Sequence, residues 1–126
     1  MALTREYRET VAERLRNDQR FTAALFAEAL TALTEGDKTT TLSIFRDLVH
    51  AHISFKRLAE ETGFDEKTLH RMLSKRGNPT MENLSCLIHQ IEGDLGLATN
   101  IEAQRIKRSG TSTKTRIVHH PALVYA

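Results

Sequence analysis

One glycine between two short helical patterns constrains the fold of this chain more than any other residue. The stretch LAEETGFDEKTLHRML places the small residue Ala59 four positions before Gly63. Two helices that cross at a steep angle need a small side chain where they touch and a turn residue that tolerates a positive φ. Ala59 and Gly63 meet these two requirements. The spacing therefore predicts a helix over 55–62, a turn, and a second helix that is capped by Asp65 and runs to about Lys75.

The second of these helices is predicted to have one apolar and one polar face. Leu69, Met72 and Leu73 face inward and hold it across the first helix. Its outward positions carry Glu66, Lys67, His70, Arg71 and Ser74. A helix held in this way fits the major groove of DNA, about 12 Å wide, where base edges show a sequence-specific pattern of donors and acceptors. The competing interpretation is a solvated helix face. We favour base contacts because of the preceding turn, and expect them from Glu66, Lys67, His70 and Arg71.

Basic and polar residues on either side of this helix suit the DNA backbone. Phosphate contacts are expected from Lys56, Arg57, Ser74, Lys75, Arg76, Asn78 and Thr80. Asn78 and Thr80 are first a turn residue and a helix cap, and the helix that follows Thr80 points backbone N–H groups at a bound anion. The net charge is only +2, but residues 51–80 hold six basic and four acidic side chains. Any nucleic-acid function therefore depends on how the charges are distributed.

Three further helices are expected in the N-terminal part of the chain. Thr4, Asp18 and Asp37 are residues that favour N-cap positions, and each precedes an apolar stripe with helical spacing. Gly36 should end the second of these helices, since glycine takes the left-handed conformation after a helix without Cβ strain. The three helices are predicted to form an antiparallel unit joined by tight turns.

The C-terminal part begins as a helix and then changes pattern. Ser54 and Thr80 are the expected caps of the helices that follow them, and Gly93 is expected to close the second. Beyond Gly93, apolar residues alternate over 95–103, which favours a β-ribbon or an extended arm over a frayed helix. Residues 105–116 hold five basic residues and no acidic one. They fit a solvated linker, a non-specific DNA contact, or a segment that orders on a partner.

Composition excludes several other classes of protein. No apolar run approaches the roughly 18 residues that a membrane span needs, and the charged N-terminus lacks a signal-peptide core, so we expect a cytoplasmic protein with no membrane partner. A single cysteine, Cys86, excludes an intramolecular disulfide. We interpret it as a small buried hydrophobe. The spacing of His, Cys and acidic residues fits no metal site, and nothing resembles a catalytic group or a cofactor motif, so we predict no metal, no cofactor and no enzyme activity.

Residues 55–74 resemble the helix-turn-helix of phage-repressor-like (Cro/repressor) regulators, in which Ala59, Gly63, Leu69, Met72 and Leu73 take the structural positions of the motif. The longer run GDKTTTLSIFRDLVHAHISFKRLAEETGFDEKTLHRMLSKRGNPTMENL is similar to the helix-turn-helix antitoxins of bacterial toxin–antitoxin modules. The matching elements are the GD pair at 36–37, the LAxxTG and LxxxLS segments, and GNPT at 77–80. The match covers about 60 residues, from Gly36 to Gly96.

From the residue pattern we expect an all-α fold with an N-terminal helical extension over 1–36 and an extended or β-like C-terminal arm over 97–126. The resemblance implies that residues 37–96 between them form a repressor-like helix-turn-helix domain. It also implies a homodimer that binds a palindromic double-stranded operator, represses its own operon, and neutralises a toxin of the ribosome-dependent endoribonuclease type. The sequence departs from the family in two places: the acidic Asp65 and Glu66 at the start of the second helix of the motif, and the long C-terminal tail. A stand-alone repressor, or a protein-interaction module that uses the arm, stays open.

Overall fold

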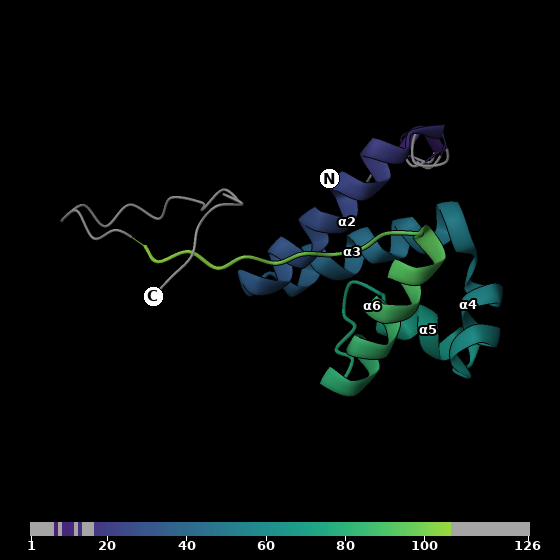
Figure 1. Ribbon diagram of the computed structural model, residues 1–126. Coiled ribbons are helices and arrows are strands. Elements are labelled where there is room, and N and C mark those ends of the chain that lie inside the picture. The colour runs from purple at the N-terminus through teal and green to yellow at the C-terminus, as the bar shows by residue number, and fades with distance from the viewer. Residues whose placement is uncertain (1–6, 8, 12, 14–16, 107–126) are drawn as a thin grey trace.

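The computed structural model describes residues 7, 9–11, 13 and 17–106. Within these residues the chain is helical and contains no strand, which confirms the all-α class for the described part (Figure 1). Residues 7, 9–11, 13 and 17 are helical, and the elements that follow are α2 (Gln19–Thr34), α3 (Lys38–Leu48), the π-helical turn η1 (Val49–Ile53), α4 (Phe55–Thr62), α5 (Glu66–Met72) and α6 (Met81–Leu95). The predicted cap Thr4 lies outside the described residues.

Local signals define the α2–α3 pair as predicted. The Asp18 carboxylate accepts a hydrogen bond from the backbone N–H of Phe21 at 3.1 Å, and the Asp37 carboxylate accepts one from that of Thr40 at 3.1 Å. Gly36 has a φ of +80°, and its N–H donates to the Leu33 carbonyl. The N–H of Asp37 donates to the Ala32 carbonyl, which completes a Schellman motif. Asp37 therefore ends one helix and begins the next.

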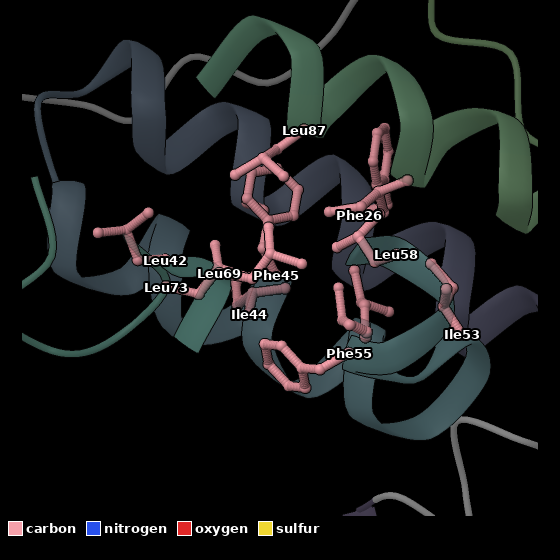
Figure 2. Packing of buried hydrophobic residues seen from close by; sticks show 14 of the residues in the cluster. Phe26, Leu42, Ile44, Phe45, Ile53, Phe55, Leu58, Leu69, Leu73 and Leu87 are labelled. Carbon is pink, nitrogen blue, oxygen red and sulfur yellow. The ribbon is translucent and has the colours of Figure 1, made fainter. Parts of the chain in front are cut away.

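A single hydrophobic core joins α2 to the later helices (Figure 2). Phe26 of α2 lies against Phe45 of α3, with ring centroids 5.8 Å apart. The largest buried apolar side chains come from every element between α3 and α6: Leu42, Phe45, Leu48, Val49, Leu58, Leu69, Leu73, Leu87 and Ile91. This burial fixes the orientation of α4, α5 and α6 relative to the α2–α3 pair.

The link between α3 and α4 is not a simple turn. Residues Val49–Ile53 form a π-helix, and the N–H of Ser54 reaches back to the Val49 carbonyl at 2.7 Å. Ser54 has a φ of +93°, in the left-handed region that non-glycine residues rarely occupy. In η1, His52 is half-buried and its Nε2 lies 3.0 Å from Thr22 Oγ1 of α2. The π-turn thus connects α2 to the start of α4.

Two predicted helix ends were wrong. α5 ends at Met72 rather than near Lys75. The chain turns there, and the Ser74 hydroxyl donates a hydrogen bond to the Arg71 carbonyl at 2.7 Å. α6 continues through Gly93 to Leu95. Gly96 ends it instead, with a φ of +69°. The N–H of the following residue donates to the Glu92 carbonyl, so a Schellman motif closes the helix three residues later than expected.

The C-terminal arm is described only over 97–106. These residues carry neither helix nor strand and follow a single extended path away from the end of α6 (Figure 1). The predicted β-ribbon is therefore not present in the described part, where Leu95 already belongs to α6. Most of the basic segment 105–116 lies outside the described residues. Among the helices described, none is long and apolar enough to cross a membrane.

Candidate nucleic-acid interface

The turn between α4 and α5 has the geometry that its sequence predicted. Ser54 caps α4, its Oγ accepting a hydrogen bond from the Arg57 N–H at 3.1 Å. Gly63 has a φ of +84° and donates its N–H to the Ala59 carbonyl at 2.9 Å. A Cβ at this position would meet no atom within 4 Å, so the glycine is required by backbone conformation and not by space. The turn therefore directs α5 across α4.

Burial separates the two faces of α5 as predicted. Leu69 and Leu73 are fully buried and Met72 is 6% exposed. The four expected base-contacting residues are all exposed: Glu66, Lys67, His70 and Arg71. Asp65 occupies the N-cap position with extended backbone, but its carboxylate makes no capping hydrogen bond. The polar face of α5 is thus open to solvent along its full length.

His70 differs from the other three exposed residues of α5 because its ring is stacked. The imidazole lies on the ring of Phe55, the first residue of α4, with centroids 3.9 Å apart and planes inclined by 17°. The contact orients the imidazole plane, while the residue as a whole stays exposed. Both ion pairs in the described residues involve Arg57, and neither includes Glu66, Lys67 or Arg71. These three side chains are not held by an ion pair within the described chain.

Arg57 is exposed, but unlike the other basic residues expected to contact phosphate it forms ion pairs with described residues. Its Nε lies 3.1 Å from Glu61 Oε2, and its Nη2 lies 3.5 Å from Asp94 Oδ1 of α6. Gln90 also donates to Asp94 Oδ1, at 3.2 Å. The pKa of the Glu61 carboxyl is raised, chiefly by hydrogen bonding with the Asp94 carboxyl and next by burial, while Arg57 opposes the rise. These contacts direct the Arg57 charge toward α6.

The segment between α5 and α6 carries the remaining expected phosphate contacts. Lys75, Arg76, Asn78 and Thr80 are exposed, as is Lys56 at the start of α4. Ser74 is half-buried, and its hydroxyl proton is used on the Arg71 carbonyl. Thr80 Oγ1 instead accepts from the Asn83 N–H at 3.1 Å, so its own proton stays available for an anion. The two hydroxyls therefore differ in their capacity to donate to phosphate.

Gly77 of the GNPT element is buried. Glycine is needed here for lack of space, whereas at position 63 it is needed for backbone conformation. A Cβ on Gly77 would lie 2.7 Å from the Met72 carbonyl carbon and 2.9 Å from the Arg71 carbonyl oxygen. These are backbone atoms at the end of α5 that cannot move aside cheaply. Only glycine therefore lets the loop pack against this helix end.

Sequence reasoning missed one residue that contacts α5. Arg46 of α3 is half-buried, and its Nη1 donates to the Leu73 carbonyl at 2.9 Å while its Nη2 lies 3.5 Å from Ser43 Oγ. A signal was present, because Leu42, Phe45, Arg46 and Val49 follow i, i+3, i+4, i+7 spacing. A basic residue within an apolar stripe indicates a buried partner.

Cys86 is exposed, so the prediction of a buried cysteine was wrong. Leu87 and Ile91 take the buried side of α6, and their neighbour Cys86 is rotated by about 100° out of the core. In the part of the chain that the structure describes, no three His, Cys, Asp or Glu side chains are grouped so that they could hold a metal ion.

Comparison with known proteins gave no match. Neither the family models, nor the curated proteins, nor the solved structures contain one that matches this chain.

Proposed function

We propose that this protein is a sequence-specific DNA-binding repressor in which α4, the Gly63 turn and α5 form a repressor-like helix-turn-helix. α5 is the reading helix and enters the major groove, while residues at both ends of the α4–α5 unit contact the DNA backbone. The domain over 37–96 supplies this unit, and α2 packs on it through the shared core. Such a repressor acts in the cytoplasm on double-stranded DNA.

The observation that carries the proposal is the composition of the exposed face of α5. A helix of seven residues that buries Leu69 and Met72 presents Glu66, Lys67, His70 and Arg71 outward. Arginine and lysine pair with guanine O6 and N7, and glutamate accepts from cytosine N4. Glu66, Lys67 and Arg71 therefore each have a base-edge partner in the major groove.

The phosphate contacts follow from the charges that stay unpaired within the described residues. Lys56, Lys75 and Arg76 are exposed and take part in neither ion pair, whereas Arg57 is bound to Glu61 and Asp94. Three such cations per chain give about six phosphate contacts in a homodimer, which corresponds to a salt slope of about −5 on a double-logarithmic plot. Thr80 and the start of α6 add neutral donors to the same strand.

A narrower proposal, which depends on the resemblance of the sequence, is that the repressor is an autoregulating antitoxin. It then forms a homodimer on a palindromic operator upstream of its own gene and neutralises a ribonuclease-type toxin encoded beside it. Co-expression tests this proposal: the protein should relieve the growth arrest caused by the product of the adjacent small gene. A repressor whose neighbouring genes encode no such inhibitor would be a stand-alone regulator.

The experiment that tests DNA binding is a titration of fluorescent duplex from immediately upstream of the gene, with random duplex as competitor and salt varied. We expect the upstream duplex to bind about 10³-fold more tightly than the random one. Equal affinities that both fall steeply with salt would reduce the protein to a weak basic surface and contradict the proposal.

A second candidate function is partner binding by the C-terminal arm. Ile101 and Ile106 are each 68% exposed, and single extended backbone is a form that a partner strand can pair with. Truncation after residue 96 distinguishes the two functions. A DNA reader keeps its operator preference in the truncated protein, whereas an interaction module loses its partner.

A further inference from the structure

The reading helix α5 is too short to hold its own orientation. It contains seven residues, and an isolated helix of fewer than about 12 residues is marginal in water. Its position in a DNA groove therefore depends on what fixes its two ends. Since a one-residue error in register would move every exposed side chain to a different base, these fixing contacts decide what the helix reads.

The two ends of α5 are fixed very differently. At the N-terminal end, Asp65 makes no side-chain capping hydrogen bond. At the C-terminal end, the backbone of Gly77 packs against Met72, and Asn83 Nδ2 of α6 lies 3.8 Å from Met72 Sδ. The Arg46 guanidinium also donates a hydrogen bond to the Leu73 carbonyl there, at 2.9 Å. The last turn is thus the anchored end of the helix.

Arg46 is suited to this task by its chemistry and its place. It lies on α3, 27 positions before Leu73 in the sequence, so its bond links the reading helix to the scaffold. A cation near the carbonyl end of a helix is also favoured by the helix dipole. Since Leu73 is fully buried, loss of the guanidinium would leave its carbonyl without that donor in a place with little access to water.

We propose that Arg46 is the positioning residue that sets the sequence specificity of this protein, by anchoring the C-terminal end of α5 to α3. It is half-buried and directed toward the Leu73 carbonyl, and it acts on DNA only through α5. The inference rests on the proposed function, because it has meaning only if α5 reads bases.

The test compares Arg46→Met with a matched control, Thr41→Val, on the same helix. Thr41 is buried and its Oγ1 donates to the Ala29 carbonyl at 3.0 Å, so its loss weakens α3–α2 packing without touching α5. Both full-length variants are titrated with the upstream and random duplexes at a temperature where circular dichroism shows each to be folded. The salt dependence of binding is measured in parallel.

For Arg46→Met we expect the ratio of upstream to random affinity to fall at least tenfold, with random-duplex affinity and salt slope unchanged. Thr41→Val should keep the wild-type ratio, and Arg46→Lys, which keeps one donor, should recover part of it. If Arg46→Met does not fold, Arg46→Gln is measured against the same criteria.

Three results would overturn the inference. An unchanged ratio in the folded Arg46 variant would remove the positioning role. An equal loss in Thr41→Val would assign the effect to general stability, and a parallel fall in random affinity and salt slope would make Arg46 a phosphate contact. The proposed function fails separately, through a wild-type protein that shows no preference between the two duplexes.

Discussion

The pairs α2–α3 and α4–α5 are both joined at a glycine with positive φ, yet they are stabilised in different ways. α2 and α3 contain 16 and 11 residues, each begins with a capping aspartate, and a double hydrogen bond closes the turn at Gly36. α4 and α5 contain 8 and 7 residues, and α5 lacks a side-chain cap. The helix starts and the turn of the first pair are thus fixed by local bonds.

The second pair is held by contacts from elsewhere in the chain. Arg46 of α3 reaches the end of α5, Asp94 of α6 pairs with α4, and the loop at Gly77 packs against Met72. A helix that is stabilised from outside does not need its own polar face for stability. Apart from the stack of His70 on Phe55, the contacts that hold α5 lie behind its exposed face, which leaves Glu66, Lys67 and Arg71 open to a partner.

The largest expected effect is on the core that both pairs share. Phe45 is fully buried and lies against Phe26, so Phe45→Ala should lower the free energy of unfolding by about 3–5 kcal/mol. Urea unfolding followed by circular dichroism measures the loss. Two separate unfolding transitions, of which only one is shifted by the substitution, would show that the two pairs unfold independently.

Gly77→Ala should break the second pair more than the first. The new methyl group would collide with backbone atoms of Met72 and Arg71, which should cost about 1–3 kcal/mol of unfolding free energy. The matched control is Gly93→Ala, at a site in α6 where a Cβ meets no atom within 4 Å. Because alanine favours helix over glycine, the control should gain up to about 1 kcal/mol. Equal thermal shifts in both variants would contradict the packing argument.

Substitutions of exposed basic residues in and after α5 test the roles proposed for them in DNA binding. Arg71→Ala should weaken binding to the upstream duplex by about 1–3 kcal/mol and leave protein stability unchanged. Lys75→Ala should weaken binding to every duplex and flatten the salt slope by about 1. A fluorescence titration at several salt concentrations separates the two patterns. The assignment of roles fails if the two variants lose the same affinity for both duplexes.

The smallest expected effect is a pH dependence of opposite sign in the two pairs. The pKa of Asp37 is lowered from 3.8 because Thr40 donates to its carboxylate through the hydroxyl and the N–H. The folded state therefore favours the ionised carboxylate. Its contribution to folding stability is present above the ordinary pKa and is lost as pH falls through the lowered pKa of the folded state. Asp37→Asn keeps a capping side chain, and the stability difference from wild type should shrink on acidification.

Glu61 should behave in the opposite way. Its pKa is raised from 4.5, first by hydrogen bonding with Asp94, so the folded state binds more protons than the unfolded state. This contribution to stability is present below the ordinary pKa and is lost as pH rises through the raised one. Chemical denaturation of Glu61→Gln between about pH 4 and 7 measures it. A difference from wild type that does not change with pH would show that the two carboxyls are not linked.

The caps and turns could be predicted from the sequence because they are local. Asp18, Asp37, Ser54 and Thr80 each bond a backbone N–H three residues ahead, so residue type and spacing suffice. The end of α6 could not be predicted in the same way. Gly93 and Gly96 are equally able to follow a helix, and the hydrogen bonds around the second of them decide between the two.

The contacts of the candidate site that the sequence did not predict join residues that are distant along the chain. Arg57 was expected to contact phosphate like its neighbour Lys56, but its ion partner Asp94 lies 37 positions away. His70 stacks on a ring that belongs to another helix, and Arg46 bonds a carbonyl 27 positions later. Exposure of the α5 face followed from periodicity, whereas the pairing of each cation required the tertiary fold.

The π-helical turn η1 makes chain length as important as residue identity at one point. The bond from the Ser54 N–H to the Val49 carbonyl spans one residue more than an α-helical bond would. Deleting a single residue between these two would let α3 continue as a regular helix and rotate everything after it by about 100° around the α3 axis. Insertions and deletions in this segment should therefore be far rarer than substitutions among proteins that keep this arrangement.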